Sequence, residues 1–327
     1  MKAILPVAGV GSRLKPHTHT VAKALLNVAG KPILAHILDS ILDLGITEAV
    51  LIIGYKGEQI KEYVHRAYPN MRFWFAEQPE RKGLGHAILL AEPFVKDQPC
   101  LIIYGDTIFI GDFSEALKTE HDGTIGVKMV DDPRRWGVIE LNGSFVANLI
   151  EKPDFVKPMP AIVGVNVIKN SKLMFECLRE IIAKNIKTKG EYQLTDAFQL
   201  MVEKGAKLTV FPIEGWYDCG KPETLLATNK YLLTKSSGYY RKREGVSIIP
   251  PVFIHDTAKV SHSIIGPYVT IDKGAIVANS IIKNSIINSY ADIRNEMLTD
   301  SLVGDYAKVS GQFKVLNVGD SSEVNIK

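Results

Sequence analysis

The stretch that decides the fold opens the chain and reads M-K-A-I-L-P-V-A-G-V-G-S-R-L-K-P, residues 1–16. Its apolar run Ala3–Val7 has the length of a buried strand. A glycine turn follows, in which Gly9 and Gly11 precede Arg13. Glycines let backbone N–H groups approach a polyphosphate where a Cβ would clash, and nearby cations neutralise its charge. The spacing matches neither a Walker loop nor a dinucleotide-binding turn. From these residues alone, a phosphate-binding loop and a structural turn are both open.

Length and composition set the class of protein. The chain has 327 residues, enough for two domains or for one domain with an extension, with 46% apolar and 23% charged residues. A net charge of +3 is too small to indicate nucleic acid or an anionic membrane as a partner. The three cysteines, Cys100, Cys177 and Cys219, lie far apart, which fits a reducing compartment and excludes a cysteine zinc site. No apolar leader or membrane-spanning run is visible, so we expect a cytoplasmic protein.

The first half of the chain alternates between strand and helix patterns. Aliphatic residues between Ile33 and Leu42 recur at helical spacing and stop before Gly45. Further strands are expected at 49–53, 73–75 and 100–104, and further helices around 60–64 and 83–91. This alternation predicts a mostly parallel sheet covered on both faces. Ligands of such sheets bind at the carboxyl ends of the strands, where Gly9 and Asp106 would both lie.

The middle of the chain has a different pattern. Strands are expected at 125–130, 137–141, 145–150 and 161–168, and helices at 173–182 and 194–202. Asn142-Gly143 joins two of the strands and is a strong hairpin signal. We expect this part to extend the same sheet and to wall off a pocket, which gives one catalytic domain over residues 1–235.

A polar linker at 236–245 precedes an internal repeat at 246–327. Aliphatic residues recur there every five or six positions. This period resembles the hexapeptide repeat of left-handed parallel β-helices, and at roughly three repeats a coil the length allows about three coils. An irregular β-sandwich is the alternative. The repeating positions are Ile254, Val260, Ile265, Ile271, Val277, Ile282, Ile287, Ile293, Leu298, Val303 and Val309.

The opening run, continued through Lys23 to L-L-N-V-A-G-K-P at Leu25–Pro32, resembles the signature of sugar-1-phosphate nucleotidylyltransferases. Ala22 and Asn27 stand where that family usually has proline, which puts loop rigidity rather than chemistry in doubt. The resemblance implies a Rossmann-like α/β nucleotidyltransferase domain with a mixed, mostly parallel sheet, followed by a short left-handed β-helix. It also implies transfer of a nucleotidyl group from UTP or dTTP to a sugar 1-phosphate, with glucose 1-phosphate as the default acceptor.

Two aspartates are candidate metal ligands. Asp106 follows a buried strand in L-I-I-Y-G-D-T, and Asp218 stands in G-W-Y-D-C-G. Alone, each is more typical of a turn or a helix cap. The resemblance implies that both bind Mg²⁺ between the nucleotide and the sugar phosphate, because carboxylates are the ligands that this hard cation takes.

The remaining site residues also follow from the resemblance. Arg13 and Lys23 are the expected cations for the triphosphate, and with Asp106, Asp218 and Lys152 they form the expected catalytic set. Glu151 and Lys152, in an E-K-P motif, are assigned to the sugar hydroxyls and the sugar phosphate. Backbone contacts to the sugar are assigned to Gly137 and Gly164. The expected nucleotide-binding residues, besides Asp106, are Ala8, Gly9, Gly11, Ser12, Gln78 and Gly83.

The base-recognition segment G-L-G-H-A, at Gly83–Ala87, looks closer to uridylyltransferases than to thymidylyltransferases, which favour G-L-A-Q-A. His86 itself is also consistent with a helix residue that faces solvent. We interpret three further signals as surface or structural features: His17-x-His19, Arg134-Arg135 and Cys219.

Two other functions compete with the nucleotidyltransferase. A non-catalytic relative that binds sugar nucleotides would be expected to lose Arg13, Lys23, Asp106 or Asp218, and all four are present. A bifunctional enzyme would add acyl transfer by the β-helix, with His255 or His262 as base. The ends of a short β-helix need cover, so we expect a homo-oligomer, formed through that domain.

Overall fold

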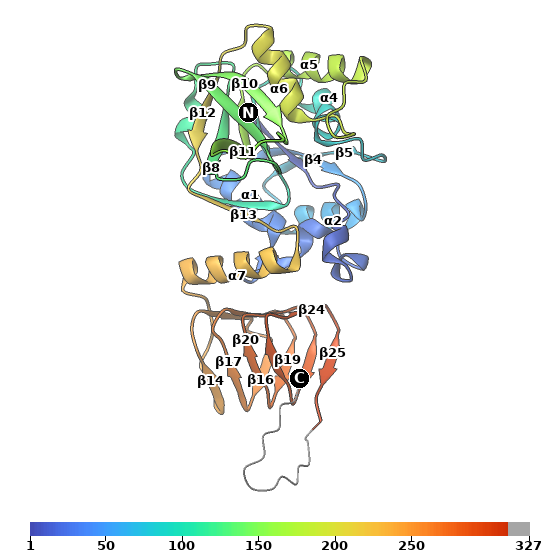
Figure 1. The fold of residues 1–327 in the computed structure, drawn as a ribbon. Coiled ribbons are helices and arrows are strands. Elements are labelled where there is room, and N and C mark those ends of the chain that lie inside the picture. Colours follow the sequence, from blue (N-terminus) through green and yellow to red (C-terminus); the bar gives the residue numbers. More distant parts are fainter. Residues whose placement is uncertain (313–327) are drawn as a thin grey trace. The chain divides into compact units, whose positions relative to one another are not determined.

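The computed structural model describes residues 1–312, so the last part of the expected β-helix domain, residues 313–327, lies outside the described residues. The described chain forms two compact units, drawn in Figure 1. The N-terminal unit contains Met1–Asn27 and Lys31–Thr228. The C-terminal unit contains Val28–Gly30 and the chain from Asn229 onward. The division falls inside helix α7 (Pro222–Ser236).

A nine-stranded mixed sheet forms the centre of the N-terminal unit. The strands β10, β9, β11, β6, β1, β4 and β5 lie side by side in that order, and β8 pairs with both β11 and β12. The pairs β1–β4, β1–β6, β4–β5 and β8–β12 are parallel. Strand β11 runs antiparallel to its neighbours and adds the middle of the chain to the same sheet, as the sequence predicts. The bounds are β1 Lys2–Pro6, β4 Glu48–Ile53, β5 Arg72–Glu77, β6 Cys100–Ile103, β8 Gly123–Val130, β9 Gly137–Asn142, β10 Phe145–Glu151, β11 Met159–Ile168 and β12 Leu208–Pro212.

Both faces of this sheet are buried. On one face, Ile4 and Ile102 join a hydrophobic cluster with Phe175 and Phe198, which come from helices α5 and α6. Leu5, which alternates with Ile4 along the strand, is also fully buried. Parallel strands buried on both sides read as continuous apolar runs, and this explains why the sequence shows them so clearly. The helices of this unit are α1 Ile33–Asp43, α2 Gly57–Ala67, α3 Leu84–Leu89, α4 Glu92–Val95, α5 Ser171–Ala183 and α6 Leu194–Glu203.

The N-terminal unit also contains short elements outside the central sheet. Three turns of 3-10 helix follow β1, at Ser12–Leu14, His17–His19 and Lys23–Leu25, and a fourth spans Glu115–Lys118. Strands β2 (Asn27–Val28) and β3 (Lys31–Pro32) pair with each other. A separate two-stranded antiparallel ribbon is formed by β7 (Thr107–Ile110) and β13 (Gly215–Asp218).

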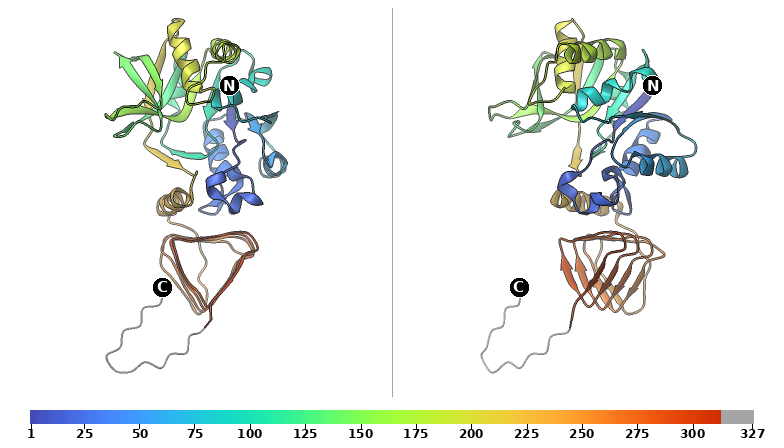
Figure 2. Two further views of the ribbon diagram at one scale, coloured as in Figure 1. Left: turned by 45° about the vertical axis from the view of Figure 1, so that its right-hand side comes forward. Right: turned by 90° about the vertical axis from the view of Figure 1, so that its right-hand side faces the viewer.

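Twelve short strands of the C-terminal unit form three parallel sheets of four strands each, and Figure 2 shows their triangular cross-section. All the pairings are parallel, which excludes the β-sandwich and is consistent with a left-handed β-helix. The bounds are β14 Val246–Ile248, β15 Val252–Ile254, β16 Lys259–Ser261, β17 Ser263–Ile265, β18 Val269–Ile271, β19 Ile276–Ala278, β20 Ile281–Lys283, β21 Ile286–Ile287, β22 Asp292–Arg294, β23 Met297–Thr299, β24 Leu302–Val303 and β25 Lys308–Ser310.

The described part of the repeat, up to residue 312, completes four coils, so the expected number of about three is wrong. Paired residues in successive coils lie only 17 or 16 positions apart, as in Ile264↔Ile281 and Ile281↔Met297. At this spacing the strands between residues 246 and 310 complete four coils, so the expected number was too low for this length of chain. The predicted aliphatic positions do stack in columns inside the helix. One such column is Ile254, Ile271, Ile287 and Val303.

Asn229 connects helix α7 to the segment Val28–Gly30 and to the β-helix, and its side chain is fully buried. Its Oδ1 accepts hydrogen bonds from the Ala29 N–H at 2.9 Å and from the Thr270 hydroxyl at 2.6 Å. Its Nδ2 donates to the Tyr268 carbonyl at 3.2 Å. A single side chain thus satisfies three polar groups.

Asn229→Ala should lower the free energy of unfolding by about 3 kcal/mol, because it leaves buried polar groups without partners. Urea denaturation followed by circular dichroism measures this change. Asn148→Ala is the matched control: its amide makes one exposed hydrogen bond to Glu140, so we expect a change below about 0.5 kcal/mol. Equal losses of unfolding free energy in the two variants would contradict a stabilising role for the buried Asn229 hydrogen bonds.

Candidate active site

The loop after β1 gives its two glycines different surroundings. A Cβ built on Gly9 would meet no atom within 4 Å, so this residue borders open space. Gly11 has a φ of 68°, and a Cβ there would lie 2.8 Å from the Thr18 methyl group and 3.1 Å from the Lys23 Cβ. Ala8 is buried. The backbone at Gly9 is therefore open to close approach by a ligand, as is the exposed Ser12, whereas Gly11 is required by the turn itself.

Hydrogen bonds hold this loop in place up to Lys23. The buried Thr18 hydroxyl donates to the Gly11 carbonyl at 2.9 Å. The Gln59 side chain, from helix α2, accepts from the Ala22 N–H at 2.9 Å and donates to the Thr20 carbonyl at 2.8 Å. Fixed backbone on both sides of the loop means that Lys23 can change its partner only by rotating its side chain.

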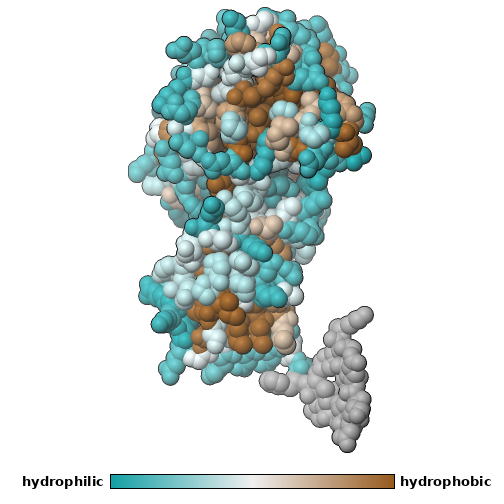
Figure 3. All heavy atoms as spheres, turned by 60° about the vertical axis from the view of Figure 1, so that its left-hand side comes forward, coloured by the Kyte–Doolittle hydropathy of each residue, from teal (hydrophilic) through white to brown (hydrophobic). Residues whose placement is uncertain are grey.

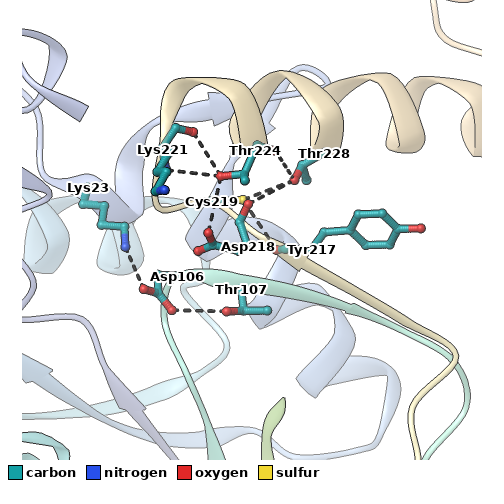
Figure 4. Close-up of polar contacts among 9 residues, drawn as sticks. All are labelled: Lys23, Asp106, Thr107, Tyr217, Asp218, Cys219, Lys221, Thr224 and Thr228. Carbon is teal, nitrogen blue, oxygen red and sulfur yellow. Dashed lines mark hydrogen bonds and ion pairs between the residues drawn. The ribbon is translucent and has the colours of Figure 1, made fainter. Parts of the chain in front are cut away.

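Asp106 lies between β6 and β7 and forms an ion pair with Lys23, shown in Figure 4. The Lys23 Nζ is 2.7 Å from Oδ2 of Asp106, and the Thr107 hydroxyl donates to Oδ1 at 3.2 Å. Burial opposes ionisation of Asp106, but Lys23, Thr107 and Arg13 outweigh this effect and hold the pKa of the carboxyl below its usual value. Asp106 is thus an anion throughout the neutral pH range.

The β7–β13 ribbon brings Asp218 beside Asp106. Asp218 pairs with Thr107, and the Cys219 N–H donates to the Asp106 carbonyl at 2.9 Å. Oδ2 of Asp218 accepts a hydrogen bond of 3.4 Å from Thr224, in the first turn of α7. A Cβ on Gly220 would lie 2.7 Å from Oδ1 of Asp218 and 2.9 Å from Nη2 of Arg13, so these two side chains flank the same small space.

Four of the six predicted charged residues, Arg13, Lys152, Asp106 and Asp218, line one cavity of about 530 Å³. This volume lies within the range of small-molecule sites. A second cavity, of about 200 Å³, is lined by Gly9, Lys23 and Asp106 among others. Asp106 therefore borders both cavities, with the glycine loop on one side of it and Lys152 on the other.

The predicted sugar-binding residues are packed tightly together. Oε2 of Glu151 accepts a hydrogen bond of 2.7 Å from the Thr195 hydroxyl, and Oε1 lies 3.5 Å from the Lys152 Nζ. A Cβ on Gly137 would lie 2.7 Å from the Thr195 hydroxyl oxygen and 2.8 Å from Oε2 of Glu151. Gly164 has a φ of 95°, and the Tyr104 ring fills the place of its Cβ. Contacts within the protein therefore disfavour a side chain at Gly137 and at Gly164, in addition to any role of these glycines in sugar binding.

Gln78 and Gly83 lie together, but Gln78 lines a different pocket. Its side-chain amide donates to the Gly83 carbonyl at 3.3 Å and lies 3.2 Å from Nδ1 of His86. Burial, followed by the Lys82 charge, lowers the pKa of His86. Gln78 borders a pocket of about 430 Å³ with Tyr55 and Lys56. His86 is only partly exposed, so it does not simply face solvent.

Sequence reasoning missed several residues of the larger cavity. Trp136 and Trp216 form an edge-to-face pair with ring centroids 4.3 Å apart, and both line the cavity. Arg134 and Arg135, which the sequence placed in a solvated turn, are exposed and also line it. The signal was present, because Trp136 stands directly before Gly137 and Trp216 lies two residues before Asp218.

A cysteine nucleophile and a cluster of protein metal ligands find no support. Cys219 is fully buried, and burial raises the pKa of its thiol to about 12, so the thiolate that a nucleophile needs is absent near neutral pH. Within residues 1–312, no group of three or more His, Cys, Asp or Glu side chains could hold a metal ion. A metal at Asp106 and Asp218 would therefore need further ligands from outside the protein. No helix in the same described range is both long and apolar enough to cross a membrane.

The chain belongs to the nucleotidyl transferase family, whose model matches residues 2–235. This match covers all the charged residues of the two cavities. The fold is similar to that of a UDP-glucose pyrophosphorylase solved with UDP-glucose, with a TM-score of 0.62 and 22% identity over 72% of this chain and 98% of that one.

Among curated relatives, the chain is 37% identical to the bifunctional protein GlmU of Methanocaldococcus jannaschii over 72% of this chain and 55% of that protein. The chain thus spans about half the length of that relative. It is 32% identical to the UTP–glucose-1-phosphate uridylyltransferase AglF of Haloferax volcanii over 68% of this chain and 93% of that protein. It is 31% identical to a glucose-1-phosphate thymidylyltransferase of Streptomyces antibioticus over 88% of this chain and 87% of that one.

Alanine at Gly9 and at Gly164 should separate binding from folding. Gly9→Ala should leave the unfolding free energy within about 1 kcal/mol of wild type and raise the nucleotide Kd about tenfold, because the methyl group projects into open space. Gly164→Ala should lower stability by about 2 kcal/mol or more, because the Tyr104 ring and the positive φ oppose a side chain. Thermal unfolding and calorimetric titration with UTP test both. Unchanged UTP affinity in Gly9→Ala would contradict a nucleotide at this loop.

Proposed function

We propose that the chain transfers a nucleotidyl group from UTP or dTTP to a sugar 1-phosphate, giving a nucleotide sugar and pyrophosphate. The single observation that carries the proposal is the convergence of Arg13, Lys152, Asp106 and Asp218 on one cavity. Family membership and the names of the relatives support it. Glucose 1-phosphate is the proposed acceptor, since two of those relatives are named for it.

The reaction requires two polyanions to be held together. An oxygen of the sugar phosphate attacks the α-phosphorus of the nucleotide in line with the leaving pyrophosphate, whose bond to that phosphorus breaks. In our proposal Arg13 neutralises the β- and γ-phosphates and Lys23 the α-phosphate. Lys152 holds the phosphate of the sugar, with Glu151 at its hydroxyls. The exposed Arg135 side chain adds positive charge along the cavity for the second polyanion, whereas Arg134, which also lines it, is paired with Asp132 at 2.7 Å.

The residues present fit a magnesium ion. Asp106 and Asp218 are carboxylates on a single cavity, which is the donor type that Mg²⁺ takes. In the described part of the chain, the hydrogen bond to the Asp218 carboxylate is made to Oδ2, by Thr224, which leaves Oδ1 for a metal in this proposal. We propose that these two residues hold Mg²⁺ together with substrate phosphates. The ion, when bound, would neutralise charge at the α-phosphate.

Base recognition is assigned to Gln78 and Gly83. The buried Gln78 amide contacts the Gly83 carbonyl. The backbone at Gly83 packs closely against Tyr192, since a Cβ at Gly83 would lie 2.5 Å from the Tyr192 carbonyl oxygen. A fixed amide and backbone groups can read the edge of a pyrimidine.

Placement of the protein in the cytoplasm stays a prediction.

Pyrophosphate release tests the function directly. Purified protein with Mg²⁺ is assayed with UTP, dTTP, CTP, GTP and ATP against the 1-phosphates of glucose, galactose, mannose and N-acetylglucosamine. We expect turnover with a pyrimidine nucleotide and glucose 1-phosphate. If the protein binds nucleotide but releases no pyrophosphate with any pair of nucleotide and sugar phosphate, the alternative of a non-catalytic protein that binds sugar nucleotides is favoured.

Asp218→Asn should reduce kcat at least about 100-fold, the scale of losing one group that stabilises charge in the transition state. Its thermal unfolding should match wild type, since Asp218 is a partly exposed residue whose backbone pairing is retained. Asp43→Asn, at the exposed end of α1, is the control and should keep full activity. Normal turnover in Asp218→Asn would mean that the metal site is misplaced.

We also propose that the C-terminal unit self-associates through one face of its β-helix. Ile264, Ile281 and Met297 lie in one register on the β14–β17–β20–β23 sheet and are exposed by 39, 41 and 78%. Figure 3 shows apolar side chains gathered on one face of this unit. A row of exposed aliphatic residues of this kind is typical of an interaction surface.

A charge in the centre of this row should weaken the association. Ile281→Glu is expected to shift the sedimenting species to monomer at micromolar concentration, and Lys283→Glu, an exposed position on the same strand, should not. Sedimentation velocity measures the difference. A wild-type protein that is already monomeric would contradict the proposal.

A further inference from the structure

We infer that Lys23 occupies the position on Asp106 that a metal ion needs, and that nucleotide binding removes it. Metal and nucleotide binding would then be coupled through one lysine side chain. The inference rests on the proposed function, because it assigns Lys23 to the α-phosphate and Asp106 to the metal. It adds how the two ligands depend on each other.

The carboxylates of Asp106 and Asp218, the proposed metal ligands, differ in how many of their oxygens have partners. Both oxygens of Asp106 have partners, since Lys23 contacts Oδ2 at 2.7 Å and Thr107 contacts Oδ1 at 3.2 Å. Within residues 1–312, the Asp218 carboxylate is engaged at Oδ2, by the longer 3.4 Å contact from Thr224. Figure 4 shows the two arrangements side by side. Asp218 can therefore accept a cation at once, whereas Asp106 must first lose one.

Burial of Lys23 limits how far salt can screen its ion pair with Asp106. The Lys23 side chain is 12% exposed, while that of Asp106 is 42% exposed at the cavity wall. A pair that is shielded in this way is screened less by salt than a pair on the surface. An ammonium and a divalent cation at the same oxygen would repel each other, so the metal binds fully only after Lys23 leaves.

The triphosphate provides the alternative partner. It carries several negative charges, against one on Asp106, and the glycine loop beside Lys23 leaves the space at Gly9 open. The Lys23 backbone is fixed, because the Leu26 N–H donates to its carbonyl at 3.1 Å and Gln59 holds Ala22. The flexible stem of the lysine can therefore move the ammonium from carboxylate to phosphate while the loop stays in place.

Linkage makes this coupling reciprocal. If nucleotide raises the affinity of the protein for metal by removing Lys23, metal raises the affinity for nucleotide by the same factor. Without nucleotide, the wild-type protein should bind metal weakly. Removal of the ammonium should then reproduce part of the effect of the nucleotide.

Mn²⁺ binding to the nucleotide-free protein tests the inference without any turnover. The full chain is titrated with Mn²⁺, and free Mn²⁺ is measured by electron paramagnetic resonance. Lys23→Met should bind Mn²⁺ about tenfold more tightly than wild type, within the usual range of coupling between sites. Lys15→Met removes an exposed charge of the same loop and should change nothing. Lys23→Met combined with Asp106→Asn should lose the gain.

Unchanged Mn²⁺ affinity in Lys23→Met would overturn the inference, as would an equal gain in Lys15→Met. If Lys23→Met fails to fold, the wild-type protein provides a second measurement. Acetylation of Lys23, followed by mass spectrometry, should become faster when saturating Mn²⁺ releases the amine from Asp106, and an unchanged rate would contradict the exchange. The proposed function fails separately, if no nucleotide and sugar phosphate pair releases pyrophosphate.

Discussion

The antiparallel pairing of β7 with β13 is the constraint on which the site depends. It joins segments more than a hundred residues apart and sets Asp218 opposite Thr107, next to Asp106. Neither aspartate is held by the central sheet alone: Asp106 follows a sheet strand, and Asp218 belongs to the ribbon. Backbone hydrogen bonds such as that from Cys219 to Asp106 fix the two carboxylates without using their side chains. The carboxylate oxygens therefore remain available for cations, whether a lysine or a metal.

Much of the fold could be predicted from the sequence because burial leaves a regular pattern. The apolar runs of β1, β4 and β6 gave the parallel sheet, and the repeat gave the columns of the β-helix. The number of coils was underestimated from the sequence, because the strands from 246 to 310 complete four coils at a spacing of 16 or 17 residues. Motifs located the charged residues of the cavity. They did not show that Lys23 would pair with Asp106, because this contact spans 83 positions and depends on the choice of rotamer.

The glycines of the site also show that a motif locates a residue without showing its contacts. Gly9 and Gly164 both match the motif positions of the family, yet one faces open space and the other lies under a tyrosine ring. The motif records that a side chain is not tolerated, and only the structure tells whether a ligand or the protein itself excludes it. The cavity residues Trp136 and Trp216 show the reverse case: each stands beside a recognised motif, but their contact requires strands β9 and β13 to be correctly placed.

The division of the chain into units is interleaved, because Val28–Gly30 belong to the C-terminal unit although they follow the Lys23 turn directly. The Phe253 ring occupies the place of a Cβ at Gly30, and Asn229 holds Ala29. Truncation after residue 228 would therefore do more than shorten the protein. It would deprive Val28–Gly30 of their packing partners. Exchange of the β-helix for another domain would therefore require compensating changes at Val28–Gly30, whose contacts it provides.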